Sequence, residues 1–396
     1  MSGFSEKQLE FFKKADHRWN FKVGAVRSGK TYADFYVIPK RIRARIGLPG
    51  LAFIFGVSKS TIERNILEPM RSIWGDRYVG EINSENVAQL FGETVYCLGC
   101  EKVSQVAKIR GASIKYAYGD EVAEWNPDVF KLLQSRLDKE YSVFDGSLNP
   151  ESPLHWLKGF LESDADIYQQ HYTIFDNPFL PPSFVKNLCH EYEGTIFYNR
   201  YILGEWTLAE GLVYPNFNNI VPTVERKYLK YIVSMDYGIQ NATAIILWGL
   251  FEGTWYGIRE YYHSGRETNE QKTDEEYYAE LEKLTGGLPI DRIIIDPSAA
   301  SFIALIRRKG KFKVRNASNA VIEGIMHVSS CLVDGTIAFN DCCKRTVQEF
   351  GLYSWKPDSP KDEPIKENDH AMDAVRYFVE TERVYKPANN YRSIFG

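Results

Sequence analysis

The sequence of 396 residues contains little cysteine and no long apolar segment. Six cysteines are too few for a disulfide framework in a chain of this size, so we expect reduced thiols. No run of eighteen apolar residues occurs, and the N-terminus lacks the apolar core of a signal peptide. These absences exclude a transmembrane helix and predict a soluble, cytoplasmic protein with no membrane partner.

An excess of charge of one sign is also missing. The chain has 48 basic and 52 acidic side chains, a net charge of −4 and a pI of about 6.1. This balance excludes a positive field over the whole molecule, although a local basic groove is enough to bind DNA. The length favours two domains, because a single hydrophobic core rarely grows beyond ~300 residues.

The first strong motif is a phosphate-binding loop. A short apolar strand over residues 21–23 leads into GAVRSGKT, residues 24–31, and a helical pattern follows. This is G-x-x-x-x-G-K-[ST] in the strand–loop–helix context that the motif requires, and it predicts ATP with Mg²⁺ as the cofactor. The alternative is a glycine-rich turn with a surface lysine. The glycines let backbone N–H groups surround phosphate oxygens, the lysine reaches the β- and γ-phosphates and the threonine holds Mg²⁺. These residues are Gly24, Gly29, Lys30 and Thr31.

An acidic pair follows another predicted strand. Residues 113–118 have the pattern of a buried strand, and Asp120 and Glu121 come directly after it. In a P-loop fold this is the place of an acid that orders Mg²⁺ and of a base that deprotonates the attacking water. We therefore predict Asp120 as a metal ligand and Glu121 as a catalytic residue. A later strand ends at Ser147 and Asn149, where a γ-phosphate sensor would lie; a simple turn is the alternative.

Strands alternate with helices through these motifs. This order predicts an α/β domain with a mostly parallel sheet and helices on both faces. From residue 153 to about 230 the pattern loosens into aromatic-rich helices, which indicates a subdomain and a linker. A hairpin with Glu252-Gly253 at its turn then opens the second half.

The second half delivers three aspartates from separate elements. Two apolar strands end at Asp236 and Asp296, and the helical segment KENDHAMDAVRYF, residues 366–378, carries Asp373. Two divalent cations ~4 Å apart, held by oxygen ligands, can bind both the attacking and the leaving oxygen of a phosphodiester. The order strand, strand, helix therefore predicts a site for two Mg²⁺ or Mn²⁺ ions. Taken singly, each aspartate could instead cap a turn or end a strand.

Two polar residues precede Asp373 on the same helical face. His370, one turn earlier, would face the same pocket and tune a ligand or a water. We expect Asp369 to cap the helix, because an aspartate at this position can accept a hydrogen bond from the first turn.

Taken together, these motifs resemble the large terminase subunit of tailed bacteriophages over nearly the whole chain. The P-loop, the acidic pair and the segments SLNP, MDYG, IIDPSA and DHAMDAVRY all match that family. The resemblance implies an N-terminal ATPase and a C-terminal ribonuclease-H-like nuclease, which RYILGEW, residues 200–206, would connect. The expected bounds are 1–210 for the ATPase with a helical lid at its end, 211–230 for a linker, and 231–396 for the nuclease with a short flexible tail.

The resemblance also assigns individual roles. It implies that Gln8 contacts adenine, that Arg27 contacts phosphate and that Arg110 reaches the nucleotide of a neighbouring subunit. The alternative for Arg110 is local packing and pairing with an acid. The valine before Arg27 departs from the family, in which a small residue is common there. The full nucleotide-binding set is Gln8, Gly24, Arg27, Ser28, Gly29, Lys30, Thr31, Asp120 and Asn149, and the catalytic set is Glu121, Asp236, Asp296, Asp373, His370 and Arg110.

A DNA-packaging motor is the function that the resemblance implies. ATP hydrolysis would move double-stranded DNA into a procapsid, and the nuclease would cut concatemeric DNA at the start and end of packaging. The expected partners are the portal protein, the small terminase subunit and further copies of this chain in a ring, with a monomer in isolation. The protein would act in the host cytoplasm and transiently on the procapsid, and would be absent from the mature virion.

Two other classes remain open. A helicase-like or repair ATPase fused to a metal-dependent nuclease would share both sites, but the strand-separation motifs expected of it are not found before the linker. A P-loop scaffold whose second domain only binds DNA would not need the three aspartates. A metal-dependent cleavage assay beside an ATPase assay separates these classes.

Overall fold

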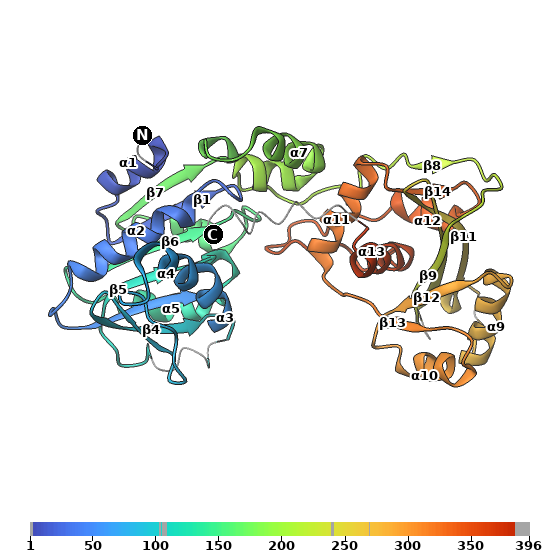
Figure 1. Cartoon of the computed structure of the whole chain (residues 1–396), viewed down its shortest axis with the longest axis horizontal. Helices are drawn as coiled ribbons and strands as arrows, with labels where there is room; N and C mark the ends of the chain where they lie inside the picture. The colour runs from blue at the N-terminus through green and yellow to red at the C-terminus, as the bar shows by residue number, and fades with distance from the viewer. Residues whose placement is uncertain (1–2, 103, 105–108, 239–240, 269, 385–396) are drawn as a thin grey trace. The chain divides into compact units, whose positions relative to one another are not determined.

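The chain forms two compact units in a computed structural model (Figure 1). The first unit contains the described residues up to 185 together with 198–208, and the second contains 186–197 and the described residues from 209 onward. Each unit has its own sheet and is described by itself. The structure describes residues 3–102, 104, 109–238, 241–268 and 270–384. The predicted flexible tail, residues 385–396, lies outside these ranges.

A seven-stranded sheet forms the centre of the first unit, in the order β3-β4-β2-β5-β6-β1-β7. Neighbouring strands pair in parallel, except β3 and β4, which form an antiparallel hairpin. The prediction of a mostly parallel sheet is confirmed. The strands are β1 (Trp19–Gly24), β2 (Leu51–Gly56), β3 (Val87–Leu90), β4 (Glu93–Gly99), β5 (Ile114–Gly119), β6 (Val143–Leu148) and β7 (Ile167–Tyr172).

Helices cover both faces of this sheet. Alternate residues of β2 show the reason: Ala52 and Ile54 join the core beneath α2, α3 and α4, whereas Phe53 and Phe55 join the core beneath α5 and α6. The helical elements are α1 (Glu6–Lys14), α2 (Lys30–Arg43), α3 (Lys59–Ile62), the π-helix η1 (Glu63–Leu67), α4 (Glu68–Trp74), η3 (Val122–Glu124), α5 (Pro127–Gln134), α6 (Trp156–Leu161), η4 (Ile174–Asp176), α7 (Pro182–Tyr192), within which the second unit begins, and η5 (Tyr198–Leu203).

The second unit has a mixed sheet in the order β13-β12-β9-β10-β11-β14-β8. Its centre, β9-β10-β11, is antiparallel, and β12, β13, β14 and β8 each join it through parallel pairs. The predicted turn at Glu252-Gly253 joins β10 to β11, and both residues have positive φ angles, as a tight hairpin requires. The strands are β8 (Ile220–Val221), β9 (Lys230–Asp236), β10 (Ala242–Phe251), β11 (Thr254–Ser264), β12 (Ile290–Ile295), β13 (Val314–Asn316) and β14 (Ile337–Asn340).

Helix α13 packs on this sheet against β9 and β10. Its apolar residues Ala371, Ala374, Val375 and Phe378 are buried. The Phe378 ring stacks on Trp248 of β10 with 4.1 Å between the ring centroids. This packing fixes the side of α13 that carries the predicted polar residues. The helices of the unit are α8 (Gly265–Thr268), α9 (Asp274–Thr285), α10 (Ala300–Lys309), α11 (Val321–Val333), α12 (Lys344–Phe350) and α13 (His370–Glu382).

A fully buried ion pair joins β1 to α2 in the first unit. Lys22 Nζ lies 2.6 Å from Asp34 Oδ1, and both side chains are inaccessible to solvent. The ammonium group also lies 3.8 Å from the centre of the Phe11 ring, and the Tyr118 hydroxyl donates to Asp34 at 3.1 Å. Burial raises the pKa of Asp34 to about 6, although Lys22 opposes this shift. Each charge therefore depends on the other to remain inside the core.

Replacing only one member of this pair should destabilise the first unit. We expect Lys22→Met to lower the free energy of unfolding by ~3 kcal/mol, because it leaves the Asp34 carboxylate buried without a countercharge. The double variant Lys22→Met/Asp34→Asn removes both charges and should regain most of that loss. Urea denaturation measures both values. Equal destabilisation of the two variants would show that lost packing, and not the unpaired charge, is the cause.

Candidate nucleotide site and carboxylate cluster

The predicted P-loop connects β1 to α2, and its glycines are required by backbone geometry. Gly24 has a φ of 153°, and a Cβ atom here would lie 2.0 Å from the carbonyl oxygen of Tyr172 on β7. Gly29, which directly precedes α2, has a φ of 87°. A Cβ atom on Gly204 would lie 2.7 Å from the Cα of Gly24, so the segment after η5 packs on the same loop. Only glycine permits these approaches.

Side chains from distant elements hold the loop backbone. Gln8 is buried, and its Nε2 donates to the Gly29 carbonyl at 2.8 Å while its Oε1 accepts from the Ser5 N–H. Asn177 Nδ2 donates to the Arg27 carbonyl at 2.7 Å. Gln8 therefore contacts the P-loop itself, and both ends of its amide are engaged within the chain.

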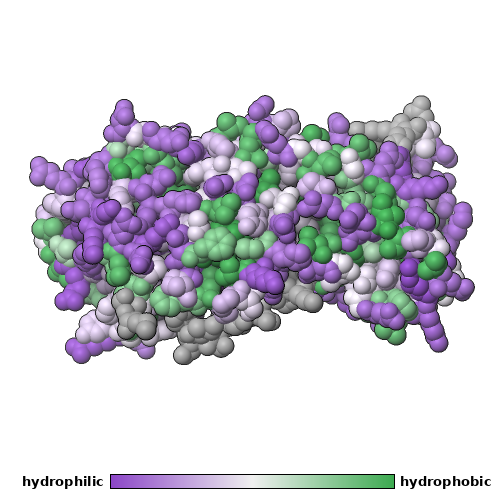
Figure 2. Space-filling model, turned by 90° about the horizontal axis from the view of Figure 1, so that it is seen from above, coloured by the Kyte–Doolittle hydropathy of each residue, from purple (hydrophilic) through white to green (hydrophobic). Residues whose placement is uncertain are grey.

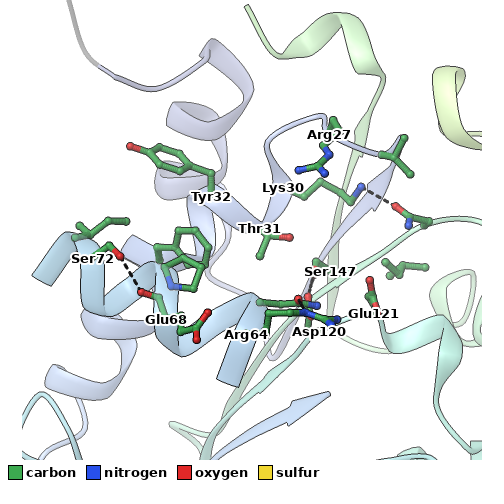
Figure 3. Close-up of a pocket in the computed structure, with 17 residues that line it drawn as sticks. Arg27, Lys30, Thr31, Tyr32, Arg64, Glu68, Ser72, Asp120, Glu121 and Ser147 are labelled. Atoms are coloured by element: carbon green, nitrogen blue, oxygen red, sulfur yellow. Dashed lines mark hydrogen bonds between the residues drawn. The ribbon is translucent and has the colours of Figure 1, made fainter. Parts of the chain in front are cut away.

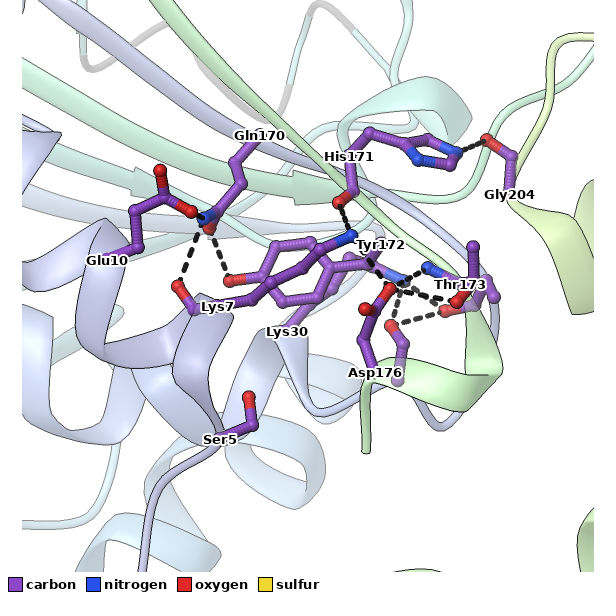
Figure 4. Close-up of polar contacts among 12 residues, drawn as sticks. Ser5, Lys7, Glu10, Lys30, Gln170, His171, Tyr172, Thr173, Asp176 and Gly204 are labelled. Atoms are coloured by element: carbon purple, nitrogen blue, oxygen red, sulfur yellow. Dashed lines mark hydrogen bonds and ion pairs between the residues drawn. The ribbon is translucent and has the colours of Figure 1, made fainter. Parts of the chain in front are cut away.

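An ion pair fixes α1 beside the end of β7 (Figure 4). Lys7 Nζ lies 2.8 Å from Asp176 Oδ2 and donates to the His171 carbonyl at 2.8 Å. The backbone N–H and the hydroxyl of Thr173 donate to the same carboxylate. Burial raises the pKa of Asp176, but these hydrogen bonds outweigh it and lower the pKa below its ordinary value. His171 in turn contacts the Gly204 carbonyl at 3.0 Å, so β7, α1 and the segment after η5 form one support for the P-loop.

Lys30 is the central cation of the site. Its ammonium group donates to the carbonyls of Gly24 and Ala25 at 2.8 and 2.5 Å, and to Asn149 Oδ1 at 3.0 Å. Burial lowers the pKa of Lys30 to about 7, against the opposing effect of Asp120. Ser28, also buried, donates its hydroxyl to the Ala25 carbonyl at 2.8 Å and so braces the loop. The contact with Asn149 joins the end of β6 to the P-loop lysine, and the role of Asn149 as a phosphate sensor stays a prediction.

Asp120 stands at the end of β5, almost fully buried. Burial raises its pKa to about 7, and the neighbouring Glu121 adds to this shift. Hydrogen bonds from Asn65 and Ser147 oppose it; the Ser147 hydroxyl donates to Asp120 Oδ1 at 3.3 Å. Glu121 has a left-handed backbone with a φ of 51°, which is unusual for a residue that is not glycine. This conformation turns the chain sharply after β5, between the buried carboxylate and η3.

One cavity of about 950 Å³ brings these residues together (Figure 3). Seven of its lining residues were predicted to bind nucleotide, to act in catalysis or to sense the γ-phosphate: Arg27, Lys30, Thr31, Asp120, Glu121, Ser147 and Asn149. Thr31 and Asp120 offer the oxygen donors that Mg²⁺ prefers, so the residues present fit a magnesium–nucleotide complex. The cavity can hold a polyphosphate between a basic loop and an acidic pair.

Arg110 lies elsewhere. It follows the gap in the described residues at 105–108, is exposed, and does not line the cavity. Its place at the surface permits contact with another molecule, and its assigned role stays a prediction.

The three aspartates of the second unit approach one another at the end of β9 and β12. These strands pair in parallel with Met235 beside Ile295, so the residues that follow, Asp236 and Asp296, leave the same edge of the sheet. Asp373 on α13 is close enough for its negative charge to raise the pKa of Asp236. The two strands and the helix thus bring their carboxylates to the same region of the unit.

Each carboxylate has its own hydrogen-bond donors. His370 Nδ1 lies 2.8 Å from Asp236 Oδ2, and Arg376 donates to Asp373 Oδ1 at 2.7 Å. Asp296 accepts from the Ser298 N–H, from Asn319 Nδ2 at 2.7 Å and from the Tyr377 hydroxyl at 3.1 Å.

Burial and hydrogen bonding shift the pKa values of these carboxyl groups in opposite directions. Burial raises the pKa of Asp236. Burial also acts on Asp296, but its hydrogen bonds outweigh it and lower the pKa. Burial lowers the pKa of His370, but the hydrogen bond to Asp236 and the nearby negative charges together outweigh it and raise the pKa. His370 is therefore a partner of Asp236, as an accessory role requires.

The predicted N-cap position of α13 is confirmed, but the expected hydrogen bond from the side chain is missing. Asp369 occupies the N-cap position, but its side chain accepts no hydrogen bond from the helix. Glu349 of α12 does so instead: its Oε2 accepts from the N–H groups of Ala371 and Met372, at 2.7 and 3.4 Å. Asp369 is left facing His370 with a pKa that burial raises, and it adds a fourth carboxylate to the region.

The side chains of this cluster are of the kind that binds divalent cations, but they are not arranged as a metal site. Carboxylate oxygens are the donors that Mg²⁺ and Mn²⁺ take. Within the described part of the chain, no three His, Cys, Asp or Glu side chains converge as a metal site.

Several supporting residues were not predicted: Asn65, Asn177, Asn319, Glu349 and Arg376. Most of them reach their site from an element that is distant in the sequence. Arg376 lies on α13, whose residues also pack against the sheet. Asn177-Pro178 carries only the signal of a turn, so no local pattern could have assigned its contact with the P-loop.

Comparison with known proteins gives the class of this chain. The family model described as "Terminase large subunit, T4likevirus-type, N-terminal" matches residues 23–219. The structure is similar to that of the large terminase from the thermophilic bacteriophage D6E, with 35% sequence identity, a TM-score of 0.83, and coverage of 96% of this chain and 99% of that one. No curated protein sequence matches.

Two further structures of the D6E protein carry nucleotides. The complex with ADP matches with a TM-score of 0.81, and the complex with ATP-γ-S with a TM-score of 0.80, both at 35% identity. They cover 96% and 95% of this chain, and 99% and 98% of their own. With such a relative matched over nearly its whole length, this chain belongs to the large terminase family.

In the described residues, no helix is both long and apolar enough to cross a bilayer. On the face shown in Figure 2, hydrophilic residues surround scattered hydrophobic patches.

Proposed function

We propose that the first unit hydrolyses ATP. The observation that carries this proposal is the cavity in which Lys30, Thr31, Asp120 and Glu121 meet, at the ends of parallel strands. Binding of ADP and ATP-γ-S by the D6E large terminase supports it.

In this proposal each residue has a defined task. Backbone N–H groups of the P-loop and the Lys30 ammonium bind the phosphates, with Arg27 at the same loop. Thr31 and Asp120 would hold Mg²⁺, which neutralises phosphate charge when bound. Glu121 accepts a proton from the attacking water, and Asn149 positions Lys30. Gln8 supports the loop, and its contact with adenine remains part of the proposal.

We propose that the second unit is a metal-dependent DNA endonuclease. Asp236, Asp296 and Asp373 would hold two divalent cations, Mg²⁺ or Mn²⁺, which polarise a phosphodiester and a water when bound. His370 orients Asp236 through their 2.8 Å contact. The parallel pairing of β9 and β12 supports this assignment, because it leaves two of the carboxylates at one sheet edge.

Together the two activities describe a viral DNA-packaging motor. ATP hydrolysis would drive double-stranded DNA into a procapsid, and the nuclease would cut concatemers. The proposed partners are DNA, the portal protein, the small terminase subunit and other copies of this chain in a ring. The proposed location is the host cytoplasm, transiently at the procapsid and not in the mature virion. Family membership supports the proposal.

A helicase-like or repair ATPase with a fused nuclease is the second candidate, because it would use the same two sites. Packaging of DNA into procapsids with the portal present, compared with unwinding of a duplex, distinguishes the two functions.

The two chemistries should separate by unit. Lys30→Ala removes the cation that neutralises the transferring phosphoryl group, so ATP turnover should fall by ~10² or more. DNA cleavage should persist, since it does not use the P-loop. Phosphate release and plasmid cleavage, measured on one preparation, check this. Normal ATP hydrolysis by a folded Lys30→Ala protein would refute the P-loop assignment.

Loss of any one aspartate should abolish cleavage. We expect Asp236→Ala, Asp296→Ala and Asp373→Ala each to lose Mg²⁺- or Mn²⁺-dependent cutting and to keep ATP hydrolysis, because each removes an oxygen ligand from a shared site. His370→Ala should reduce cutting without removing it. Chelation should stop cutting by the wild type. A crystal soaked in Mn²⁺ with no metal beside these carboxylates would contradict the assignment.

Arg110 should act across a subunit boundary. An arginine supplied by a neighbour can raise the rate of phosphoryl transfer by ~10³ or more. Arg110→Ala should bind nucleotide but resist stimulation on the portal, and mixing it with Lys30→Ala subunits should restore part of the activity. Each mutant then supplies what the other lacks. Inactivity at every mixing ratio, with mixed assembly verified, would exclude this role.

A further inference from the structure

Arg64 lies in the same cavity as the predicted nucleotide-binding residues, although no motif includes it. It belongs to η1, the π-helical turn between α3 and α4, and lines the cavity with Lys30 and Glu121. Figure 3 shows its side chain extending from η1 toward Asp120. π-helical turns are rare and occur frequently at functional sites.

The contacts of Arg64 connect it to the acidic pair. Its Nε donates to Asn65 Oδ1 at 3.0 Å, and the Asn65 side chain lies close enough to Asp120 to oppose the rise that burial causes in the pKa of that carboxyl. The side chain of Arg64 is exposed, and its two terminal nitrogens make no hydrogen bond within the described residues. The guanidinium is therefore held at one nitrogen and free to bind at the other two.

Arg71, a neighbour of Arg64 in the sequence, shows what an arginine with a structural role looks like here. Arg71 on α4 lies 2.7 Å from Glu63 and donates to the carbonyls of Val79 and Gly80, so its Nε and one terminal nitrogen are both engaged. Arg64 makes no ion pair within the described residues. It brings positive charge to the side of the cavity opposite the P-loop, where Glu68, Asp120 and Glu121 otherwise supply negative charge.

Phosphoryl transfer places negative charge on the oxygens of the γ-phosphoryl group. Positioned cations stabilise this charge more than they stabilise bound ADP. The P-loop supplies cations from one side only, and the guanidinium of Arg64 can approach from the other. Its planar fork can bind phosphate while Nε keeps its partner Asn65.

We propose that Arg64 is a catalytic residue of ATP hydrolysis that acts within its own subunit, by contacting the γ-phosphoryl group from the side of the cavity opposite the P-loop. Asn65 is its positioning residue and links it to Asp120. This inference rests on the proposed ATPase function and adds to it a cation that the P-loop motif does not contain.

The test compares the affinity of the full chain for ADP and for the transition-state analogue ADP·AlF₄⁻, both with Mg²⁺. Arg64→Ala should lower kcat by ~10²-fold and weaken ADP·AlF₄⁻ by a similar factor, with the Kd for ADP changed less than about twofold. Arg64→Lys should recover only part of the loss, because a lysine cannot bind phosphate and Asn65 together. Arg43→Ala, which removes an exposed arginine at the end of α2 outside the cavity, is the matched control and should behave as the wild type.

The outcomes distinguish the possible failures. Equal weakening of ADP and ADP·AlF₄⁻ by Arg64→Ala would assign Arg64 to cavity structure and overturn the inference. Unchanged kcat would overturn it as well. If the wild-type chain neither binds ADP nor hydrolyses ATP, the proposed ATPase function fails and this inference fails with it. An active wild type with an unimpaired Arg64→Ala variant removes the inference alone.

Discussion

The parallel pairing of neighbouring strands decides where the polar residues of both units lie. In the first unit β1, β5 and β6 run in the same direction, so the P-loop, Asp120 and Asn149 emerge at one edge of the sheet. In the second unit β9 and β12 are paired with Met235 beside Ile295, and two carboxylates follow at adjacent positions. Side chains that are distant in sequence thus become neighbours through backbone hydrogen bonds alone. The roles assigned to the P-loop, Asp120, Asp236 and Asp296 depend on this arrangement.

The cost of burying charge shapes the first unit. Lys22 and Asp34 are fully buried together beneath the P-loop, and Lys30 is buried among carbonyl and amide oxygens. Lys30 is held by these fixed acceptors at the cavity, so it needs little reorganisation to meet a phosphate. Tyr118 joins the two regions: its hydroxyl donates to Asp34 and lies 3.2 Å from the Ser147 hydroxyl, which contacts Asp120. The buried side chains beneath the nucleotide site therefore also orient Asp120.

In the second unit, partners on α13 offset the cost of burying carboxylate groups. Asp236 and Asp373 repel each other, and His370 and Arg376 supply the opposing charge and hydrogen bonds. Gly324 on α11 makes this possible, because a Cβ atom there would lie 2.5 Å from Cγ of Arg376 and displace it. Glu349 holds the first turn of α13, so the helix that carries Asp373 is fixed from α12.

Local patterns in the sequence determined much of this protein: the P-loop, the acidic pair after β5, the hairpin at Glu252-Gly253 and the two α/β units. These features depend on residues close together in the chain, where spacing fixes backbone geometry. Asp369 occupies the predicted N-cap position but makes no capping hydrogen bond, because Glu349 from a separate helix accepts from the first-turn N–H groups. The contacts of Asn65 with Asp120 and of Asn177 with the P-loop could likewise not be predicted, since they arise where separate elements pack. The sequence by itself determined which chemical groups the chain carries and at which strand ends. Only the tertiary structure decided their partners, because packing between distant elements sets the distances on which hydrogen bonds and charge interactions depend.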